Sequence, residues 1–389
     1  MIDSIFAEAQ TMKNRITTGE FHERVRNIRE QMEKRGLDVL FIYSQRRGHV
    51  PYVSGYRPNY HTNSAVIVLP LDRDPVMWVK FAFDLPRARK VSWIEDIRAS
   101  KSESAAQMVA SCADEMRSLG FARSRVGVVA ADLAIDEMGA TLDAALRAGL
   151  PDAQLEPASD LLNDLRLIKS AAEIAALRES ARLADLVAAT LAKEIRPGKS
   201  ERLAAAQAGN AARLEGGECD IIISSDASRI TYPPSDFEFG PHSAVNCEIT
   251  VQNAGYWVQI CRVFSVGAPS VGQREVFQVA HGAYSAGVKA SKPGARVCDV
   301  FEASNHVITG SGLKNFAEFG PGHGVGLDLP ELYGIDHECK ALLAPGVILV
   351  VHPGIWVAGK GAAFIGGPIA VTDAGNIHLD TPQSEIFEV

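Results

Sequence analysis

The chain has 389 residues, of which 47% are hydrophobic and 22% are charged, and this length favours two or three domains. Its 39 lysine and arginine residues are outnumbered by 47 aspartate and glutamate residues, giving a net charge of −8. The apolar content excludes a disordered chain, and the acid excess disfavours nucleic acid or a membrane surface as the main partner. We therefore expect an enzyme that acts on a small molecule or a peptide.

Six cysteines occur without a CxxC pair, which is too few for a disulfide scaffold and the wrong spacing for structural zinc. We expect reduced, mostly buried thiols. No segment approaches the ~20 apolar residues that cross a bilayer, and charges run through the first thirty residues where a signal peptide would be apolar. These features predict a cytoplasmic protein.

Helix and strand patterns alternate through the first part of the chain. Glu20–Arg35 has a charged amphipathic pattern that ends at Gly36 and predicts a helix. Strands are predicted at Val39–Tyr43, Ala65–Leu69, Val76–Val79 and Val126–Ala130. A second helix is predicted at Ser104–Leu119. This alternation predicts an α/β domain over residues 1–165.

The second part repeats one order of elements. Ser170-Ala-Ala-Glu173 is a capping-box sequence, and apolar residues then recur at three- and four-residue steps as far as Ile195. Ser200 begins a second helix after a Pro-Gly stop. The order returns with helices predicted at Arg274–Lys289 and Val297–Ile308. Residues 166–389 are therefore predicted to form a domain with two related halves about a pseudo-two-fold axis.

Four segments carry a resemblance to a known family. They are VNCEITVQNAGYWVQICRVFSVG, EFGPGHGVGLDLPELYG, LLAPGVILVVHPGIW and PIAVTDAG, in that order. Together they resemble the creatinase, prolidase and methionine-aminopeptidase family, whose fold is called the pita-bread fold. The resemblance implies a mixed α/β (α+β) chain, with a creatinase-like α/β domain at 1–165 and a pita-bread catalytic domain at 166–389.

In the metallopeptidase members of that family, two aspartates, one histidine and two glutamates bind two metal ions. Position by position, these ligands fall on Glu248, Gln259, His323, His352 and Gly366. A dinuclear site needs about four carboxylates to bridge its two ions, whereas only one carboxylate remains here. We therefore expect no metal and no cofactor; the alternative is a single ion held by Glu248, His323 and His352.

Two metal-free relatives, creatinase and ectoine hydrolase, suggest a different reaction. The resemblance to them implies a metal-independent hydrolase that cleaves a C–N bond other than a peptide bond, in a small guanidino, amidine or cyclic amide compound. Glu248 lies on the predicted core strand Val245–Val251, where burial of a carboxylate is costly unless it forms an ion pair or has a function. We predict that Glu248, His323 and His352 are catalytic, with the two histidines as general acid and base near their usual pKa of about 6.5.

Seven further residues are predicted to bind the substrate. They are Tyr232, Gln259, Arg262, Glu331, Arg57, Tyr60 and His61. A buried ion pair between Glu248 and Arg262 is the alternative to a functional carboxylate. In creatinase, the N-terminal loop that corresponds to the last three residues reaches the neighbouring subunit's site, so the resemblance implies a homodimer.

Two other functions remain open from the sequence. One is a metal-dependent Xaa-Pro dipeptidase or aminopeptidase. The other is a catalytically inactive binding module on the same fold.

Overall fold

The computed structural model describes residues 16–58, 62–101, 104–131, 133–225, 232–313 and 316–389. These residues form two compact units, 16–166 and 167–389, which are described separately below. Within the described ranges, no helix combines the length and the apolar content that a membrane span requires.

The first unit contains a six-stranded sheet in the order β4-β3-β2-β1-β5-β6. Strands β1, β5 and β6 are parallel, whereas β2 runs antiparallel to both β1 and β3. The strands are β1 (Val39–Ser44), β2 (Ala65–Pro70), β3 (Val76–Val79), β4 (Asp96–Ala99), β5 (Arg125–Val129) and β6 (Gln154–Pro157). The central strands β1 and β2 are buried along their whole length, as their continuous apolar sequences predict.

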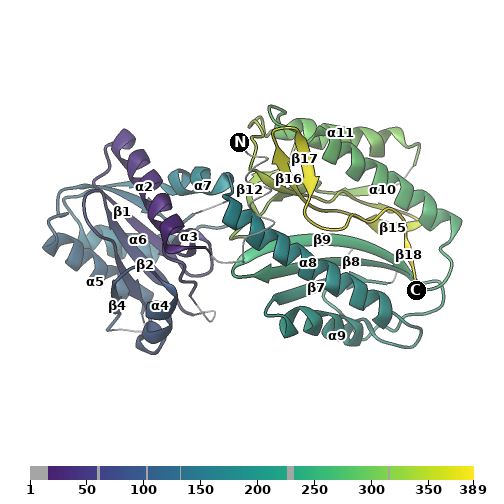
Figure 1. Ribbon diagram of the computed structural model, residues 1–389, viewed down its shortest axis with the longest axis horizontal. Coiled ribbons are helices and arrows are strands. Elements are labelled where there is room, and N and C mark those ends of the chain that lie inside the picture. Colours follow the sequence, from purple (N-terminus) through teal and green to yellow (C-terminus); the bar gives the residue numbers. More distant parts are fainter. Residues whose placement is uncertain (1–15, 59–61, 102–103, 132, 226–231, 314–315) are drawn as a thin grey trace. The chain divides into compact units, whose positions relative to one another are not determined.

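Helices accompany this sheet (Figure 1). They are α2 (Thr18–Arg35), α3 (His49–Ser54), α4 (Leu85–Val91), α5 (Ala105–Ser118), α6 (Gly139–Gly149) and α7 (Ser159–Leu167). The side chain of Thr17 caps α2, and Gly36 ends it with a φ of 66°, a conformation that glycine adopts without strain. Helix α6 was not predicted, because it begins after Met138 without a side-chain cap and so gives no start signal.

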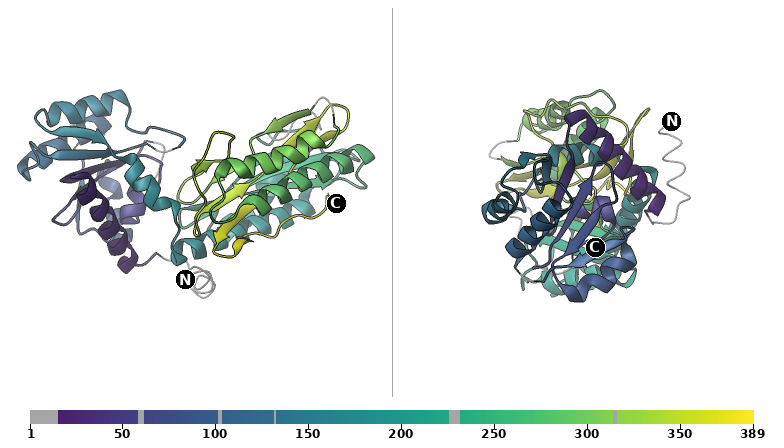
Figure 2. Two further views of the ribbon diagram at one scale, coloured as in Figure 1. Left: turned by 90° about the horizontal axis from the view of Figure 1, so that it is seen from above. Right: turned by 90° about the vertical axis from the view of Figure 1, so that its left-hand side faces the viewer.

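The second unit is built from two helix pairs and the strands that they cover (Figures 1 and 2). The pairs are α8 (Ala171–Glu194) with α9 (Glu201–Leu214), and α10 (Val271–Ala290) with α11 (Val297–Gly310). The capping box at Ser170 and Glu173 is confirmed. A second capping box, between Ser270 and Gln273, begins α10 ahead of the predicted start at Arg274.

Within the described residues the strands of this unit form three sheets, and the first carries Glu248 and Gln259 of the candidate site. Its order is β18-β9-β8-β7, with β7 (Glu218–Ser224), β8 (Ala244–Asn253), β9 (Tyr256–Ser265) and β18 (Phe387–Glu388). The second has the order β12-β11-β13-β16-β17 and the third β10-β14-β15. Their strands are β10 (Phe316–Phe319), β11 (Gly322–Gly324), β12 (Glu331–Gly334), β13 (Ile348–Val351), β14 (Gly354–Val357), β15 (Gly361–Phe364), β16 (Gly367–Thr372) and β17 (Gly375–His378). The mixed α/β architecture predicted from the sequence is confirmed.

Candidate functional site

A chain of hydrogen bonds joins three of the predicted site residues. On β8 and β9, Glu248 lies opposite Cys261, and Gln259 lies two residues further along on the same face. The Gln259 side-chain Nε2 donates to Glu248 Oε1 at 2.5 Å, and its Oε1 lies 3.1 Å from Nε2 of His323. Two sheets therefore meet at the side chain of Gln259.

The glycines around His323 serve strand packing. A side chain at Gly322 would collide with the carbonyl oxygen of Val350 on β13, and one at Gly324 with the carbonyl oxygen of Leu332 on β12. These two close approaches fix β11 between its neighbours. The Nδ1 atom of His323 lies 3.0 Å from the carbonyl oxygen of Gly324.

His352 lies directly after β13 and is buried. The centroid of its ring lies 5.2 Å from that of His323 and 5.2 Å from that of Phe364, edge-on in both cases. Neither ring nitrogen of His352 has a hydrogen-bond partner among the described residues. A side chain at Gly366 would collide with the carbonyl oxygen of Val351 and would lie 2.5 Å from Cα of His352, so this position has room for glycine alone.

Burial shifts the pKa values of all three candidate catalytic groups. It raises the pKa of Glu248, against the hydrogen bond from Gln259, and it lowers the pKa of His323. For His352, burial and then the neighbouring His323 lower the pKa to about 3. This pKa lies well below the value of about 6.5 that we predicted for His352, because burial disfavours the charged form of the ring.

Acid should destabilise the protein through His352. Its folded-state pKa of about 3 lies below the unfolded value of about 6.5, so the unfolded chain takes up the proton first as the pH falls. Stability is then lost below about pH 6.5, by at most ~1.4 kcal/mol per pH unit for one such group. Denaturant unfolding at several pH values between 7 and 4 should show a shallower loss for His352→Gln than for the parent chain. His337→Gln, at an exposed histidine, is the control; equal slopes for His352→Gln and the parent chain would contradict the assignment.

The residues present do not fit a dinuclear metal centre. The described part of the chain has no group of three histidine, cysteine, aspartate or glutamate side chains placed to hold an ion. Gln259 contributes a neutral amide that is already bonded to Glu248 and His323. Gly366 contributes no ligand and has no space for one. No step of the reaction is therefore derived through a metal.

Arg262 and Glu331, two predicted substrate-binding residues, hold the domain together instead. Arg262 is 2% exposed, and its guanidinium donates to Asp380 Oδ2 at 2.8 Å and to the carbonyl oxygen of Gly366 at 2.9 Å. The predicted alternative of an ion pair between Glu248 and Arg262 is also wrong. Glu331 is buried and accepts from Lys169 Nζ at 2.7 Å. Both side chains are committed to contacts within the domain, so neither is free to bind a substrate.

The hydrogen bonds described above do not include the remaining predicted residues, two of which fall outside the described residues. Tyr232 pairs through its backbone with Ile223 of β7, and its side chain is 41% exposed. In the first unit, Arg57 Nη1 donates to the carbonyl oxygen of Arg46 at 2.7 Å. Tyr60 and His61 fall outside the residues that the structure describes.

Two neighbours of the site were missed by the sequence reasoning. The charge of Asp220 raises the pKa of Glu248, and Asp220 lies opposite Thr250, two pairs along from the pair that includes Glu248. The alternation of β7 with β8 could have indicated Asp220, because cross-strand pairs share a face. Phe364 gave no comparable signal, since its contact with His352 depends on a separate sheet.

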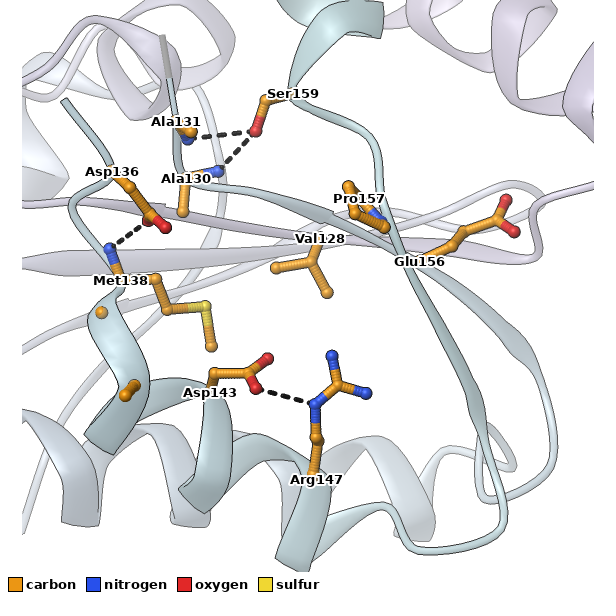
Figure 3. Close-up of a pocket in the computed structure, with 12 residues that line it drawn as sticks. Val128, Ala130, Ala131, Asp136, Met138, Asp143, Arg147, Glu156, Pro157 and Ser159 are labelled. Atoms are coloured by element: carbon orange, nitrogen blue, oxygen red, sulfur yellow. Dashed lines mark hydrogen bonds and ion pairs between the residues drawn. The ribbon is translucent and has the colours of Figure 1, made fainter. Parts of the chain in front are cut away.

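A cavity of about 310 Å³ lies within the first unit, at the ends of β5 and β6 and beside α6 (Figure 3). Its charged groups already have partners. Asp143 accepts from Arg147 at 2.7 Å, and Glu156 accepts from Arg125 at 3.2 Å. We assign this cavity no ligand.

The fold and the described site define a pita-bread protein with a creatinase-type N-terminal domain. The sequence model described as Metallopeptidase family M24 matches residues 175–373, and that of the Creatinase/Prolidase N-terminal domain matches residues 24–168. The chain belongs to metallopeptidase family M24. The predicted family and fold class are both confirmed.

Three relatives show how far the similarity extends. A Bacillus subtilis protein named uncharacterized peptidase YqhT is 27% identical over 94% of this chain and 99% of its own length. The Xaa-Pro dipeptidase of Pyrococcus furiosus is 28% identical over 59% of this chain and 67% of its own length. The solved Xaa-Pro dipeptidase from Bacillus anthracis superposes with a TM-score of 0.83 at 23% identity, covering 95% of this chain and 100% of that one.

These relatives overturn the predicted reaction. We expected a metal-independent, creatinase-like hydrolase acting on a C–N bond other than a peptide bond. The matched family is one of metallopeptidases, and the relatives' names refer to peptidases and dipeptidases. The prediction failed because it weighted the changed ligand positions above the similarity of the whole chain.

Proposed function

We propose that residues 167–389 form a peptidase domain that acts on short peptides, with Xaa-Pro dipeptides as the first substrates to test. The similarity to peptidases over nearly the whole chain supports this proposal, and it carries more weight than any single residue of the site. The earlier alternative of an Xaa-Pro dipeptidase or aminopeptidase thereby becomes the leading one.

The side chains of the site carry polar groups that can position a peptide. His323 keeps an imidazole at the position that the family retains, and Gln259 orients its ring by hydrogen bonding. Glu248, with a raised pKa, lies at the other end of the same amide. A carboxyl group and an imidazole so placed can accept and donate hydrogen bonds to a peptide carbonyl and amine.

The test is release of proline from a panel of Xaa-Pro dipeptides by the purified full chain. Matched Xaa-Ala dipeptides serve as controls. Because the family is one of metallopeptidases, each substrate is assayed with Mn²⁺, Co²⁺ or Zn²⁺ and with a chelator. We expect proline release above the enzyme-free blank in at least one arm, and absence of release in every arm would contradict the proposal.

Calorimetric titration of the same dipeptides separates an inactive binding module from an enzyme. Saturable binding without turnover in any arm would favour the binding module. The homodimer and the cytoplasmic location stay predictions, for light scattering and cell fractionation to check.

A further inference from the structure

A buried ion pair ties β12, the strand beside the one that carries His323, to the start of α8. Lys169, which directly precedes the capping residue Ser170, is 3% exposed, and Glu331, the first residue of β12, is 6% exposed. The Nζ of Lys169 donates to Glu331 Oε2 at 2.7 Å. These two residues lie 162 positions apart in the chain, so the pair joins two distant segments of the domain.

Further hydrogen bonds fix both partners of this pair. The backbone N–H of Lys169 donates to the carbonyl oxygen of Gly346 at 3.0 Å. Glu331 Oε1 accepts from the backbone N–H of Asp328 at 3.1 Å. A side chain at Gly326 would lie 2.5 Å from Glu331 Oε2. The carboxylate is therefore enclosed between the turn that leads into β12 and the ammonium group of Lys169.

The pairing of β11 with β12 is irregular beside His323. His323 lies opposite Gly334, whereas the next residue, Gly324, lies opposite Glu331. In a regular antiparallel pair the partner of Gly324 would be Tyr333, so the register shifts by two residues at this point. Irregularities of this kind redirect a neighbouring side chain. The place where this one falls along β12 therefore decides how His323 is presented.

We propose that Lys169 is a positioning residue for His323 and acts through Glu331. By holding Glu331 opposite Gly324, Lys169 fixes the point at which the register shifts. The ring of His323 is thereby kept with Nε2 3.1 Å from the amide oxygen of Gln259. Lys169 bonds to the strand that supports the candidate site, so its effect on the reaction is indirect. This role rests on the proposed peptidase function.

The first test is Lys169→Met, which keeps most of the apolar part of the side chain and removes the ammonium group. We expect kcat for the cleaved Xaa-Pro dipeptide to fall about 10–100-fold while KM stays within about twofold of the parent value, because a misplacement of about 1 Å can cost 10²-fold in rate. Lys360→Met is the matched control, because Lys360 pairs with Glu275 at 2.6 Å in a partly exposed ion pair of the same domain. Its kcat should equal that of the parent chain.

A double variant separates positioning from the burial of charge. Lys169→Met alone takes the ammonium group away from the buried Glu331 carboxylate, which is destabilising. Adding Glu331→Gln removes that charge, and the glutamine oxygen can still accept from the N–H of Asp328. We expect the double variant to regain part of the lost stability in denaturant unfolding, while kcat stays low because β12 still lacks its bond to Lys169. Recovery of kcat together with stability would contradict the proposal.

A second measurement needs no peptide turnover. In protein made with isotope-labelled histidine, the NMR signal of the His323 ring is assigned by its loss in His323→Gln. Lys169→Met should shift or split this signal, because the ring moves relative to the carbonyl oxygen of Gly324 and the amide of Gln259. The signal of the exposed His337 should stay in place. If Lys169→Met does not fold, the double variant serves for both measurements.

The outcomes distinguish this proposal from the proposed function. A lower kcat with retained KM, together with a displaced His323 signal, supports the positioning role. An unchanged His323 signal contradicts it, and so does an unchanged kcat where the parent chain is active. If the parent chain cleaves no dipeptide, the proposed function fails, and the His323 signal alone then supports or contradicts the link through Lys169.

Discussion

Replacement of His323 by alanine is expected to lower kcat/KM for the cleaved dipeptide by about 10²–10⁴-fold, the range that a positioned acid-base group contributes. His323 is the imidazole that Gln259 links to Glu248, with Nε2 3.1 Å from the amide oxygen. Alanine removes the ring and leaves the side-chain Oε1 of Gln259 without the partner at His323, while its Nε2 keeps the bond to Glu248. The measurement is steady-state kinetics on the Xaa-Pro dipeptide that gives the highest rate.

The control for this experiment is His337→Ala. His337 is exposed, with 68% of its side-chain surface accessible, so its loss should leave the kinetics as they are. Circular dichroism should show the same helix content for both variants and the parent chain. Full activity in a folded His323→Ala variant would remove this residue from the reaction.

Replacement of Arg262 by methionine is expected to destabilise the second domain by about 3–5 kcal/mol, the cost of leaving a buried charge without its partner. Arg262 and Asp380 are buried, with 2% and 0% of their side-chain surfaces exposed. The same guanidinium also donates to the carbonyl oxygen of Gly366, which ties β9 to the residue before β16. Methionine fills much of the volume but removes the donor to Asp380 Oδ2, while the carbonyl oxygen of Gly366 keeps the backbone N–H of Cys261.

Chemical denaturation followed by the fluorescence of Trp257 and Trp356 reports this loss in the second domain. Arg182→Met is the matched control, because Arg182 pairs with Glu179 and Glu215 at the surface, where an ion pair is worth at most about 1 kcal/mol. Equal stability losses in Arg262→Met and Arg182→Met would show that the buried network carries no special weight.

Local patterns were sufficient to predict the longer helices and several of the buried strands. The Ser170 capping box and the apolar spacing after it placed α8 to within a residue, because both signals lie within the helix itself. Strand β8 could also be predicted from the sequence, because its buried residues form a nearly continuous apolar run. Helix α6 lacks a cap and was missed.

The site was only partly predictable, because contacts between separate sheets decide which side chains lie together. Glu248, Gln259 and His323 were all named from the sequence, and the structure brings them together. Arg262 was named for the same reason, yet its charge is directed at Asp380, which lies 118 residues further along the chain. Nothing in the spacing of the sequence distinguishes an arginine that faces a substrate from one that faces a distant carboxylate.

The lack of space at Gly366 has a consequence for how this site can change by mutation. A side chain there would collide with the backbone oxygen of Val351 as well as crowd His352. Exchange of His352 for a carboxylate would therefore not open position 366, because the obstacle is the spacing of two backbones. A second carboxylate at Gly366 requires the two segments to separate first, so single substitutions at these positions are expected to be strongly non-additive. The distance between the backbones at Gly366 and Val351 therefore limits which substitutions this site can accept, more than the chemistry of any one side chain does.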